Sequence, residues 1–575
     1  MKRASLLQAL IITVIIYIPV IWISILIAQS LGNGLPDFLK NFADAIQNPF
    51  HIVWTKYSLE TIVICSLIYF FAAGIYFLSN RNTRDGEEHG SARWVSPRSV
   101  DAMFRQKENI RLTKHVRLGM DTHKHKRNLN ILVIGGSGAQ KTLGFCIPSI
   151  LAANANFVVT DPKNEILNAT GNLLKMKGYD IRVLNLVNME NSDGYNPFCY
   201  LTDEASVLLL ANTIITATTA KGAHESDPFW TKAETALLEA LVYYLMYEAP
   251  PYEQNFAMIM RMLEFAEVKE EDEDFVSPLD MLFESLERDV GPDHLAVKMY
   301  KVYRQAAGKT AKSIIVSLAV RLAPFNIPQI REITSHDDMD LNTLGEKKVA
   351  LFAVVPDNHS TYNFIVSLLY QQAFQSLYYS ADQIHGGSLP RHVRFILDEF
   401  PSIKLDGYTR ELATMRSRNI SASTIIQNVS QIKELYKYSW ETIPGNSDTI
   451  LYLGGNEQES HKWISTALGS SSIQTKTHGQ SHGRSGSYST NYQISKRELL
   501  TPDEVRMLDN RYAILLIRGV FPVMDEKTNP WRCPNIQYTT LGGAPPYVHH
   551  KKTFIGRPLF QPQTHNQISD KEHIS

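Results

Sequence analysis

The sequence has few cysteines and no excess of charge of either sign. Its 575 residues include four cysteines, 57 lysine and arginine residues and 58 aspartate and glutamate residues, for a formal net charge of −1. The cysteines are far apart and none forms a C-x-x-C pair. This pattern argues against a disulfide framework or a zinc site and fits a reducing cytosol. The balanced charge excludes a polybasic DNA-coating protein, although a basic channel lining is compatible with it.

The overall composition is that of an ordinary globular protein. Hydrophobic residues make up 44% of the chain and charged residues 20%. These values exclude a wholly disordered chain and a collagen-like repeat. At about 150 residues per domain, the length predicts three or four structural units.

Charge is missing altogether from one N-terminal stretch. After Lys2 and Arg3 the next charged residue is Asp37. A bilayer-spanning helix needs about 20 apolar residues, whereas the apolar run of a cleaved signal peptide has about 7–15. The sequence therefore predicts a retained transmembrane helix over about residues 6–30. A second uncharged stretch predicts another over about 61–80.

Basic residues at the flanks predict the orientation of this anchor. Two of them precede the first predicted helix, and Arg81 and Arg84 follow the second. The positive-inside rule places both ends in the cytoplasm. Residues 1–85 are thus predicted to be a multi-pass anchor in the cell membrane, with the N-terminus and the large C-terminal domain in the cytoplasm. The loop of about 32–60 would lie outside.

A glycine-rich loop follows a short apolar run at residues 129–134, which predicts a buried parallel strand. This is the context of a Walker A loop, whose backbone N–H groups surround phosphate at a helix N-terminus. Lys141 would contact the β- and γ-phosphates of ATP, and the Thr142 hydroxyl would bind Mg²⁺. The loop consists of Gly135, Gly136, Ser137, Gly138, Ala139, Gln140, Lys141 and Thr142.

One residue of this loop departs from the motif G-x-x-x-x-G-K-[ST]. Gln140 stands where the second fixed glycine belongs. A side chain at this point would crowd the phosphates or force a costly backbone conformation. The alternative interpretation is a glycine-rich strand–helix turn that no longer binds nucleotide.

Residues 393–399 form a second candidate phosphate-site motif. They read as an apolar strand that ends in two acids, the Walker B pattern. Asp398 would hold Mg²⁺, and Glu399 would orient or deprotonate the attacking water. A strand that ends in solvated acids gives the same pattern, so the motif gains weight from the loop at 135–142.

Further short segments occur in order between about residues 86 and 530. With the two motifs and the anchor they resemble the type IV secretion coupling proteins of bacterial conjugation, TraG/TraD-type DNA-pumping ATPases related to FtsK, and most of all a Gram-positive subgroup. The segments are Gly90-Ser91-Ala92-Arg93-Trp94, Thr160-Asp161-Pro162-Lys163, Asp227-Pro228-Phe229-Trp230, Val320-Arg321-Leu322-Ala323-Pro324-Phe325, Leu453-Gly454-Gly455 and Leu500-Thr501-Pro502-Asp503-Glu504.

The resemblance implies an α/β fold, namely a RecA-like P-loop nucleotide-binding domain with an inserted all-α domain, preceded by two transmembrane helices. The nucleotide-binding domain would comprise residues 86–200 and 326–545, and residues 546–575 would be a polar tail. Helical apolar spacing supports an all-α insertion over 201–325. Its predicted helices are 204–219, 228–248, 255–267, 278–288 and 294–306.

Two further site residues are implied by the same resemblance. Gln427 ends a predicted strand at 421–427, where RecA-like ATPases place a polar residue that contacts the γ-phosphate. Arg416 would be the arginine finger that acts on a neighbouring subunit's site, although Arg418 lies close by. A solvated arginine on a helix is the plain alternative for both Arg416 and Arg418.

The function implied is that of a membrane-anchored coupling ATPase with ATP and Mg²⁺ as cofactors. The alternative, which Gln140 motivates, is a hydrolysis-deficient membrane docking receptor for the DNA substrate. Its partners would be single-stranded DNA with an attached relaxase, type IV secretion channel proteins and further copies of itself in a homo-hexamer.

Residues 470–494 are rich in serine, glycine, glutamine and histidine and predict a long mobile loop. Asp161 and Lys163 would lie near the nucleotide or in a surface turn with an ion pair.

Overall fold

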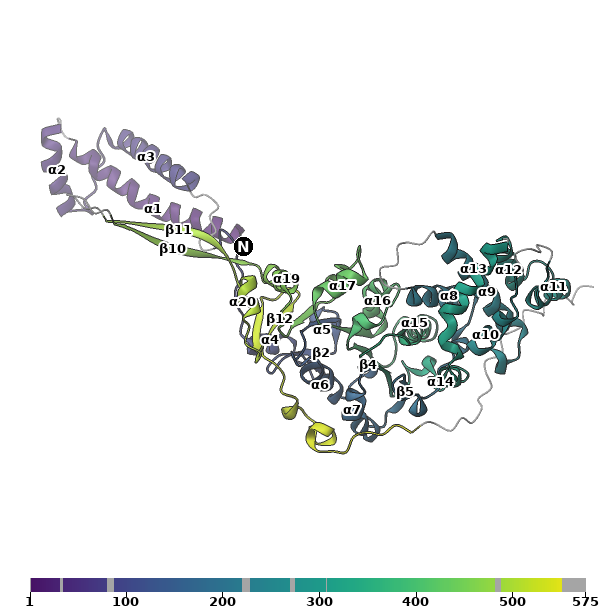
Figure 1. The fold of residues 1–575 in the computed structure, drawn as a ribbon. Helices are drawn as coiled ribbons and strands as arrows, with labels where there is room; N and C mark the ends of the chain where they lie inside the picture. Colours follow the sequence, from purple (N-terminus) through teal and green to yellow (C-terminus); the bar gives the residue numbers. More distant parts are fainter. Residues whose placement is uncertain are drawn as a thin grey trace, which may run out of the picture. The chain divides into compact units, whose positions relative to one another are not determined.

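The structure, a computed structural model, describes residues 2–31, 35–79, 87–219, 228–268, 275–306, 308–480 and 488–550. Arg81 and Arg84 of the predicted membrane flank, and residues 551–575 of the predicted tail, lie outside the described residues. The chain divides into two units, shown in Figure 1. The first unit contains Met1–Ser91 and Ser472–Lys496, and the second contains Ala92–Ser471 and Arg497–Ser575.

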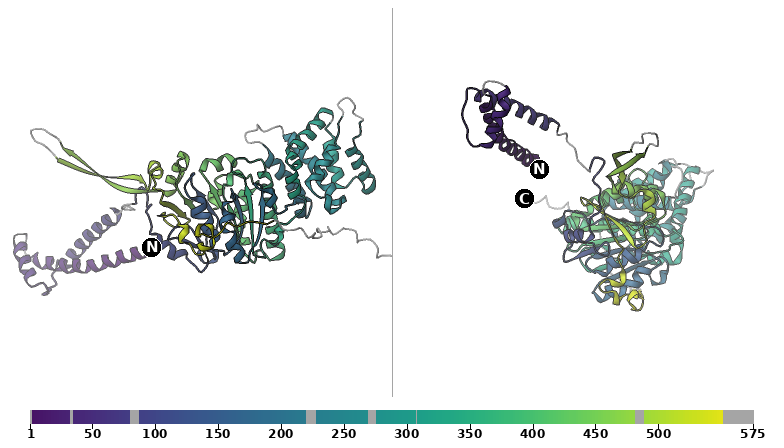
Figure 2. Two further views of the ribbon diagram at one scale, coloured as in Figure 1. Left: turned by 60° about the horizontal axis from the view of Figure 1, so that its bottom comes forward. Right: turned by 90° about the vertical axis from the view of Figure 1, so that its left-hand side faces the viewer.

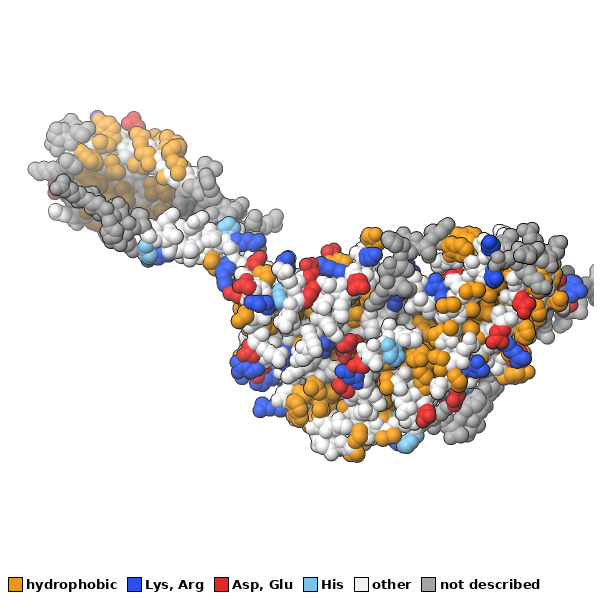
Figure 3. Space-filling model, in the orientation of Figure 1, with side chains coloured by type: hydrophobic (Ala, Val, Ile, Leu, Met, Phe, Trp, Pro, Cys, Tyr) orange, Lys and Arg blue, Asp and Glu red, His pale blue; other side chains and the backbone are white. Residues whose placement is uncertain are grey.

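Two long apolar helices dominate the first unit, α1 Lys2–Ser30 and α3 Ser58–Ser79. They cover the predicted membrane-spanning segments. Each contains an 18-residue window that is long and apolar enough to cross a membrane, Thr13–Ser30 and Ser58–Ile75. Among the side chains that the structure describes, many apolar ones on both helices are exposed, and Figure 3 shows orange areas on this unit. An exposed apolar surface of this length fits contact with lipid rather than with water.

Polar side chains on α1 and α3 bond between the two helices. The Tyr17 hydroxyl lies 2.8 Å from the Ser66 hydroxyl, and the Tyr69 hydroxyl donates to the Thr13 carbonyl at 2.7 Å. Polar groups in an apolar environment need such partners, because lipid offers none. The pairing therefore allows both helices to keep polar residues within an otherwise apolar surface.

A third helix in the first unit was not predicted. Helix α2, Leu35–Gln47, lies within the segment expected to be a loop between the two spans. It is amphipathic, with Phe38, Phe42 and Ile46 spaced four residues apart on one face. The Phe38 and Phe42 rings stack with their centroids 5.4 Å apart. The helical spacing is present in the sequence, but it is short and lies between two longer apolar runs with a stronger signal.

The prediction of a loop at 470–494 is wrong for the residues of this segment that the structure describes, and residues 481–487 lie outside them. Strands β10, Ser470–Gln480, and β11, Tyr488–Glu498, pair as a two-stranded sheet. Threonine, tyrosine and isoleucine favour strands, but here polar residues occupy both faces, so no hydrophobic alternation marks them. Cross-strand contacts replace it, including a 2.7 Å hydrogen bond between the Thr475 and Ser495 hydroxyls.

The centre of the second unit is a mixed β-sheet. Its strands are β3 Ile131–Ile134, β4 Asn156–Pro162, β5 Asp180–Asn185, β6 Val349–Val355, β7 Val393–Leu397, β8 Ile420–Ile426, β9 Thr449–Tyr452, β12 Tyr512–Ile517 and β13 Val523–Glu526. Within the described residues they form nine strands in the order β13-β12-β9-β3-β8-β7-β4-β6-β5. The pairs from β9 to β5 are parallel, and β12 is antiparallel to both its neighbours. A small separate sheet pairs β1 Asn109–Arg111 with β2 Arg117–Gly119.

The central strands are buried on both faces. Every residue of β3, β6, β7 and β8 is buried. Along β3, Leu132 and Ile134 join one hydrophobic cluster, and Ile131 and Val133 join the cluster on the opposite face. Parallel strands covered on both sides read as continuous apolar runs, and the strands expected at 129–134, 393–397 and 421–427 are confirmed for this reason.

Helices cover both faces of this sheet (Figures 1 and 2). They are α4 Pro97–Phe104, α5 Thr122–His125, α6 Ile147–Leu151, α7 Glu165–Met176, α14 Pro328–Ile333, α15 Asn363–Tyr379, α16 Tyr408–Thr414, α17 Val429–Leu435, α18 Thr442–Gly445, α19 Gln458–Leu468 and α20 Pro502–Arg506. Helix α15, which is buried along most of its length, packs against α8 of the helical group described next.

Six helices gather at one end of the second unit, where Figures 1 and 2 show them in teal. They are α8 Glu204–Thr218, α9 Pro228–Glu248, α10 Phe256–Glu264, α11 Pro278–Val290, α12 Leu295–Arg304 and α13 Gly308–Leu322. The five predicted helices are confirmed. The division of the chain into domains at residues 201 and 325 stays a prediction. Stacked rings hold the group together, with centroids 3.9 Å apart for Phe283 and Tyr300 and 4.3 Å apart for Phe256 and Phe325.

A buried ion pair joins two of these helices. Glu234 on α9 and Arg321 on α13 lie 2.7 Å apart from Oε2 to Nε, and their side chains are 3% and 18% exposed. The Ser317 hydroxyl also donates to Glu234. Loss of the arginine would leave a carboxylate buried without its counter-charge, which is a large penalty in a low-dielectric interior.

We expect Arg321→Met to lower the free energy of unfolding of the helical group by about 3–5 kcal/mol. Thermal or urea unfolding of the detergent-purified chain, followed by circular dichroism, measures the change. Arg511→Met is the matched control, because its ion pair with Asp509 is largely exposed and should leave the midpoint unchanged. Equal midpoints for both variants would show that the buried pair contributes nothing to stability.

Candidate active site

Three predicted site segments leave the sheet at the same edge. The glycine-rich loop follows β3, Asp398 and Glu399 follow β7, and Gln427 follows β8. Strand β8 lies between β3 and β7 and is parallel to both. The carboxyl ends of parallel strands meet at one edge, so these segments, far apart in sequence, come together there.

The loop after β3 has an open ring of backbone donors. The N–H groups of Ser137, Gly138 and Gln140 form no hydrogen bond with any residue that the structure describes. Gly138 has a φ of 76°, a left-handed conformation that glycine adopts without strain. The Lys141 ammonium donates to the Gly136 carbonyl at 3.1 Å. Such a loop fits a phosphate group, which accepts hydrogen bonds from successive N–H groups.

A second glycine-rich segment closes the loop from one side. The Gly136 N–H donates to the Gly454 carbonyl at 2.8 Å. A Cβ added at Gly136 would lie 3.1 Å from the Gly455 Cα, so a side chain here would have to displace the backbone of the neighbouring segment. The segment Leu453-Gly454-Gly455, which contributes to the family resemblance, therefore has a packing role beside the candidate phosphate site.

Gln140 adopts the backbone conformation that its position in the motif requires. Its φ is 68°, in the left-handed region, and the residue is exposed. A residue with a Cβ pays roughly 1–2 kcal/mol for this conformation. The expected backbone strain is thus present, and the surrounding structure has to offset it.

A hydroxyl and a carboxylate meet beside the loop. The Thr142 hydroxyl donates to Asp398 Oδ2 at 2.7 Å, and Asp398 is only 3% exposed. Thr142 begins a π-helical turn, Thr142–Cys146, that continues into α6. Burial raises the pKa of Asp398, although the Thr142 hydroxyl and the Lys141 ammonium partly counter this effect. Two hard oxygen ligands at hydrogen-bonding distance fit Mg²⁺.

Two hydrogen bonds, one to its side chain and one from its backbone N–H, fix the position of Glu399. The Gln427 side-chain amide donates to Glu399 Oε1 at 3.0 Å, and the Glu399 N–H donates to Asp398 Oδ1 at 3.1 Å. Glu399 has a φ of 54°, an uncommon conformation for a non-glycine residue. The structure therefore brings together Thr142 with Asp398, and Glu399 with Gln427, as two adjoining pairs.

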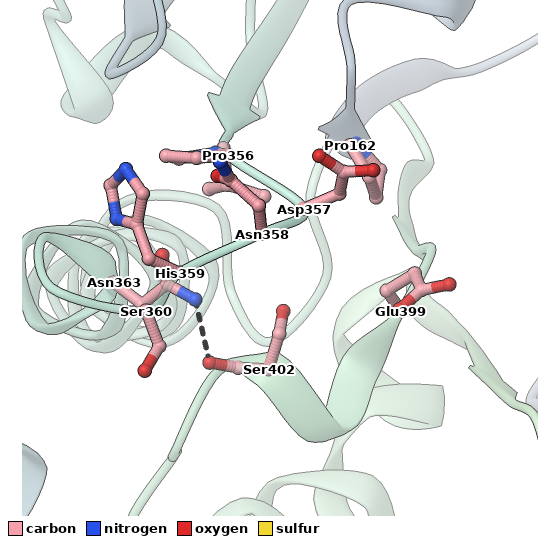
Figure 4. Close-up of a pocket in the computed structure, with 10 residues that line it drawn as sticks. Pro162, Pro356, Asp357, Asn358, His359, Ser360, Asn363, Glu399 and Ser402 are labelled. Atoms are coloured by element: carbon pink, nitrogen blue, oxygen red, sulfur yellow. Dashed lines mark hydrogen bonds between the residues drawn. The ribbon is translucent and has the colours of Figure 1, made fainter.

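A pocket of about 240 Å³ lies at this edge, beside Glu399. Figure 4 shows it between the ends of β4 and β6, with Pro162, Glu399 and Ser402 around it. Asn363 also lines the pocket, and its side-chain amide donates to the Ser402 carbonyl at 2.8 Å. The pocket is polar and large enough for water, so water can reach the Glu399 side chain.

Asp161 is buried rather than part of a surface turn. Strand β4 runs to Pro162, and Asp161 accepts hydrogen bonds from the Ile166 and Leu167 N–H groups at 3.0 and 2.7 Å. Burial, with a smaller contribution from the nearby Asp398 carboxylate, raises its pKa to about 7 against these hydrogen bonds. Lys163 pairs with Asp357 at 3.2 Å.

The two candidate finger arginines differ in their contacts. Arg418 pairs with Asp382 at 2.7 Å, and its guanidinium lies 4.4 Å from the centre of the Tyr378 ring. Arg416 is exposed and makes no ion pair or side-chain hydrogen bond with the residues that the structure describes. Both lie in a 3₁₀-helix, Met415–Arg418.

One residue at this site was not predicted from the sequence. Lys527, just after β13, donates from its ammonium to the Ala139 carbonyl of the loop at 3.1 Å. It lies almost 400 residues from that loop, and no motif marks it. A lone lysine between acidic and polar residues forms no sequence pattern that would link it to the loop.

The strand order and the clustered motifs define a RecA-like P-loop nucleotide-binding domain with an added helical domain. This fold is shared with the plasmid coupling protein TrwB. TrwB in complex with the ATP analogue ADPNP has a TM-score of 0.57 at 15% identity, covering 78% of this chain and 97% of that chain. TrwB in complex with ADP and Mg²⁺ has a TM-score of 0.55 at 15% identity, covering 76% and 93%.

Residues 94–541 match the family described as Type IV secretory system Conjugative DNA transfer, and the chain belongs to this family. It is 22% identical over 81% of its length to protein VirD4 of Rhizobium rhizogenes, of which it covers 68%. It is 23% identical over 68% of its length to VirD4 of Rhizobium radiobacter, of which it covers only 55%. It is also 23% identical over 74% of its length to the conjugal transfer protein TraG of Escherichia coli, of which it covers 72%.

The raised pKa of Asp161 predicts a pH-dependent contribution to stability. Near pH 6 the folded chain holds a proton at Asp161 that the unfolded chain, with an ordinary pKa near 3.8, has released. This favours the folded state at low pH, and the contribution is lost as the pH rises from about 4 through 7.

In Asp161→Asn this titration is absent. We expect the difference in unfolding free energy between wild type and variant to shift by on the order of 2 kcal/mol between pH 5 and pH 7, in favour of the wild type at pH 5. Urea unfolding of both proteins at several pH values measures it. Parallel pH profiles would contradict the prediction.

Proposed function

We propose that this coupling protein is a membrane-anchored ATPase that recruits a relaxase–DNA substrate and feeds it to a type IV secretion channel. The observation that carries the proposal is the pairing of Thr142 with Asp398 and of Glu399 with Gln427 at one edge of the sheet. The nucleotide complexes of the fold relative TrwB support ATP and Mg²⁺ as its cofactors.

Each group of residues has a separate role in the proposed hydrolysis. The loop N–H groups and the Lys141 ammonium would bind the phosphates. Mg²⁺, when held by Thr142 and Asp398, would neutralise phosphate charge. Glu399 would accept a proton from the water that attacks the γ-phosphorus, while the bond to the β-phosphate oxygen breaks. The amide of Gln427 keeps the Glu399 carboxylate oriented for this step.

We assign the arginine finger to Arg416 rather than Arg418. Arg418 is already held by Asp382 and Tyr378, whereas Arg416 is free to reach an adjacent subunit's phosphates. A finger in trans requires a ring of subunits, and a homo-hexamer is the assembly that the family resemblance implies. Subunit contact would then control hydrolysis, since each site is incomplete alone.

The membrane anchor and the substrate complete the proposal. Helices α1 and α3 would cross the cell membrane and leave both the N-terminus and the second unit in the cytoplasm. Single-stranded DNA would pass through the ring by phosphate contacts without sequence readout. The helical group α8–α13 would recognise the relaxase, although a purely structural cap is the plainer role for it.

Replacement of the proposed base tests the motor directly. We expect Glu399→Gln to lower ATP turnover by about 10²–10⁴-fold and to leave nucleotide affinity nearly unchanged, because the amide keeps the shape and loses the basic oxygen. Phosphate release and nucleotide binding by the detergent-purified chain measure the two quantities. Glu346→Gln, which removes a carboxylate paired with His385, is the control.

Other outcomes of this experiment separate the alternatives. A wild-type chain that binds no nucleotide at all would support the hydrolysis-deficient docking receptor. Nucleotide binding with equal turnover in Glu399→Gln would refute the role of that residue. Conjugative transfer that survives Lys141→Ala would refute the motor itself.

The finger assignment predicts complementation between two inactive variants. Arg416→Ala should lose about 10³-fold or more in turnover, and Lys141→Ala should also be inactive. In mixed rings some interfaces pair an intact loop with an intact Arg416, so mixing should restore part of the activity. Arg418→Ala is the control and should retain turnover. A mixture no more active than its two components would exclude a finger at Arg416.

A further inference from the structure

Lys527 reaches the phosphate loop from the far end of the chain. Its ammonium donates to the Ala139 carbonyl at 3.1 Å and to Asn510 Oδ1 at 2.6 Å. The residue is only 7% exposed, and its own N–H donates to the Arg511 carbonyl at 2.8 Å. A lysine fixed at both its backbone and its ammonium holds the carbonyl in one orientation.

The orientation of this carbonyl determines that of the next N–H. A peptide unit is planar and trans, so the C=O of Ala139 and the N–H of Gln140 point in opposite directions. The Ala139 carbonyl points out of the loop toward Lys527. The Gln140 N–H therefore points away from Lys527, and it belongs to the ring of donors without a described partner.

This peptide is also where the loop departs from its motif. Gln140 has a φ of 68°, where glycine would be unstrained. In a ligand-free loop, a glutamine could relieve the strain by a peptide rotation that turns its N–H away from the phosphate. A charge-assisted hydrogen bond to the preceding carbonyl opposes that rotation.

We propose that Lys527 is a positioning residue that holds the Ala139–Gln140 peptide in its phosphate-binding orientation and so replaces the missing glycine. It touches the loop backbone and acts through the Gln140 N–H. The inference rests on nucleotide binding by the loop, as proposed above, and adds the reason why Gln140 is compatible with it.

A double-mutant cycle on the detergent-purified full chain tests this proposal, with a fluorescent ATP analogue and Mg²⁺ as the probe. Lys527→Met should weaken binding by about tenfold, the order expected for loss of a charge-assisted hydrogen bond. Gln140→Gly alone should bind at least as tightly as wild type. In the double variant, Gln140→Gly should recover most of the loss, because a glycine needs no support at this φ.

Matched variants keep the test specific. Lys114→Met removes an ion pair to Glu526, one residue from Lys527, and should leave affinity unchanged. Lys527→Arg should retain most of the binding. If Lys527→Met does not fold, Asn510→Ala, which frees one side of the ammonium, should lower affinity by a smaller factor that Gln140→Gly again restores.

The contrary results are distinct from one another. Equal affinity of Lys527→Met and wild type would overturn the positioning role and leave the proposed function intact. A loss that Gln140→Gly does not restore would also overturn it, since a general packing defect behaves in this way. A wild-type chain without nucleotide binding would overturn the proposed function and this inference together.

Discussion

The candidate chemistry depends on the position of one strand. Because β8 pairs in parallel with both β3 and β7, the phosphate loop, the two acids and Gln427 all emerge at the same edge. Register is as important as order, since a shift of one residue along a strand turns its side chains to the opposite face. The hydrogen bonds from Thr142 to Asp398 and from Gln427 to Glu399 exist only in this register.

The sequence predicted those parts of the fold whose signal is local. The strands at β3, β7 and β8 are continuous apolar runs, and the helices of the α8–α13 group follow apolar spacing. The hairpin of β10 and β11 escaped prediction because its stability comes from cross-strand polar pairs rather than from a buried face. Helix α2 escaped it because a short amphipathic pattern lies between two stronger apolar ones.

The candidate site was predicted in its residues but not in its support. Motif spacing identified Lys141, Asp398 and Glu399, whereas the contact of Gly136 with Gly454 and that of Ala139 with Lys527 join segments more than 300 residues apart. Such contacts depend on the complete sheet, including the antiparallel strands β12 and β13 at its far side. In the proposal for Lys527, a tertiary contact supplies at Gln140 what the local sequence lacks, and the motif alone does not show such a contact.

The electrostatics of the site favour a bound cation. Burial raises the pKa of both Asp161 and Asp398, and smaller contributions come from the Asp398 carboxylate at Asp161 and from Glu399 at Asp398. Burial of two neighbouring carboxylates opposes folding unless a cation or a proton compensates them. Lys141 and the Thr142 hydroxyl compensate Asp398 only in part. Mg²⁺ bound with a nucleotide would supply the remaining charge, so the proposed site would be most stable with both of them bound.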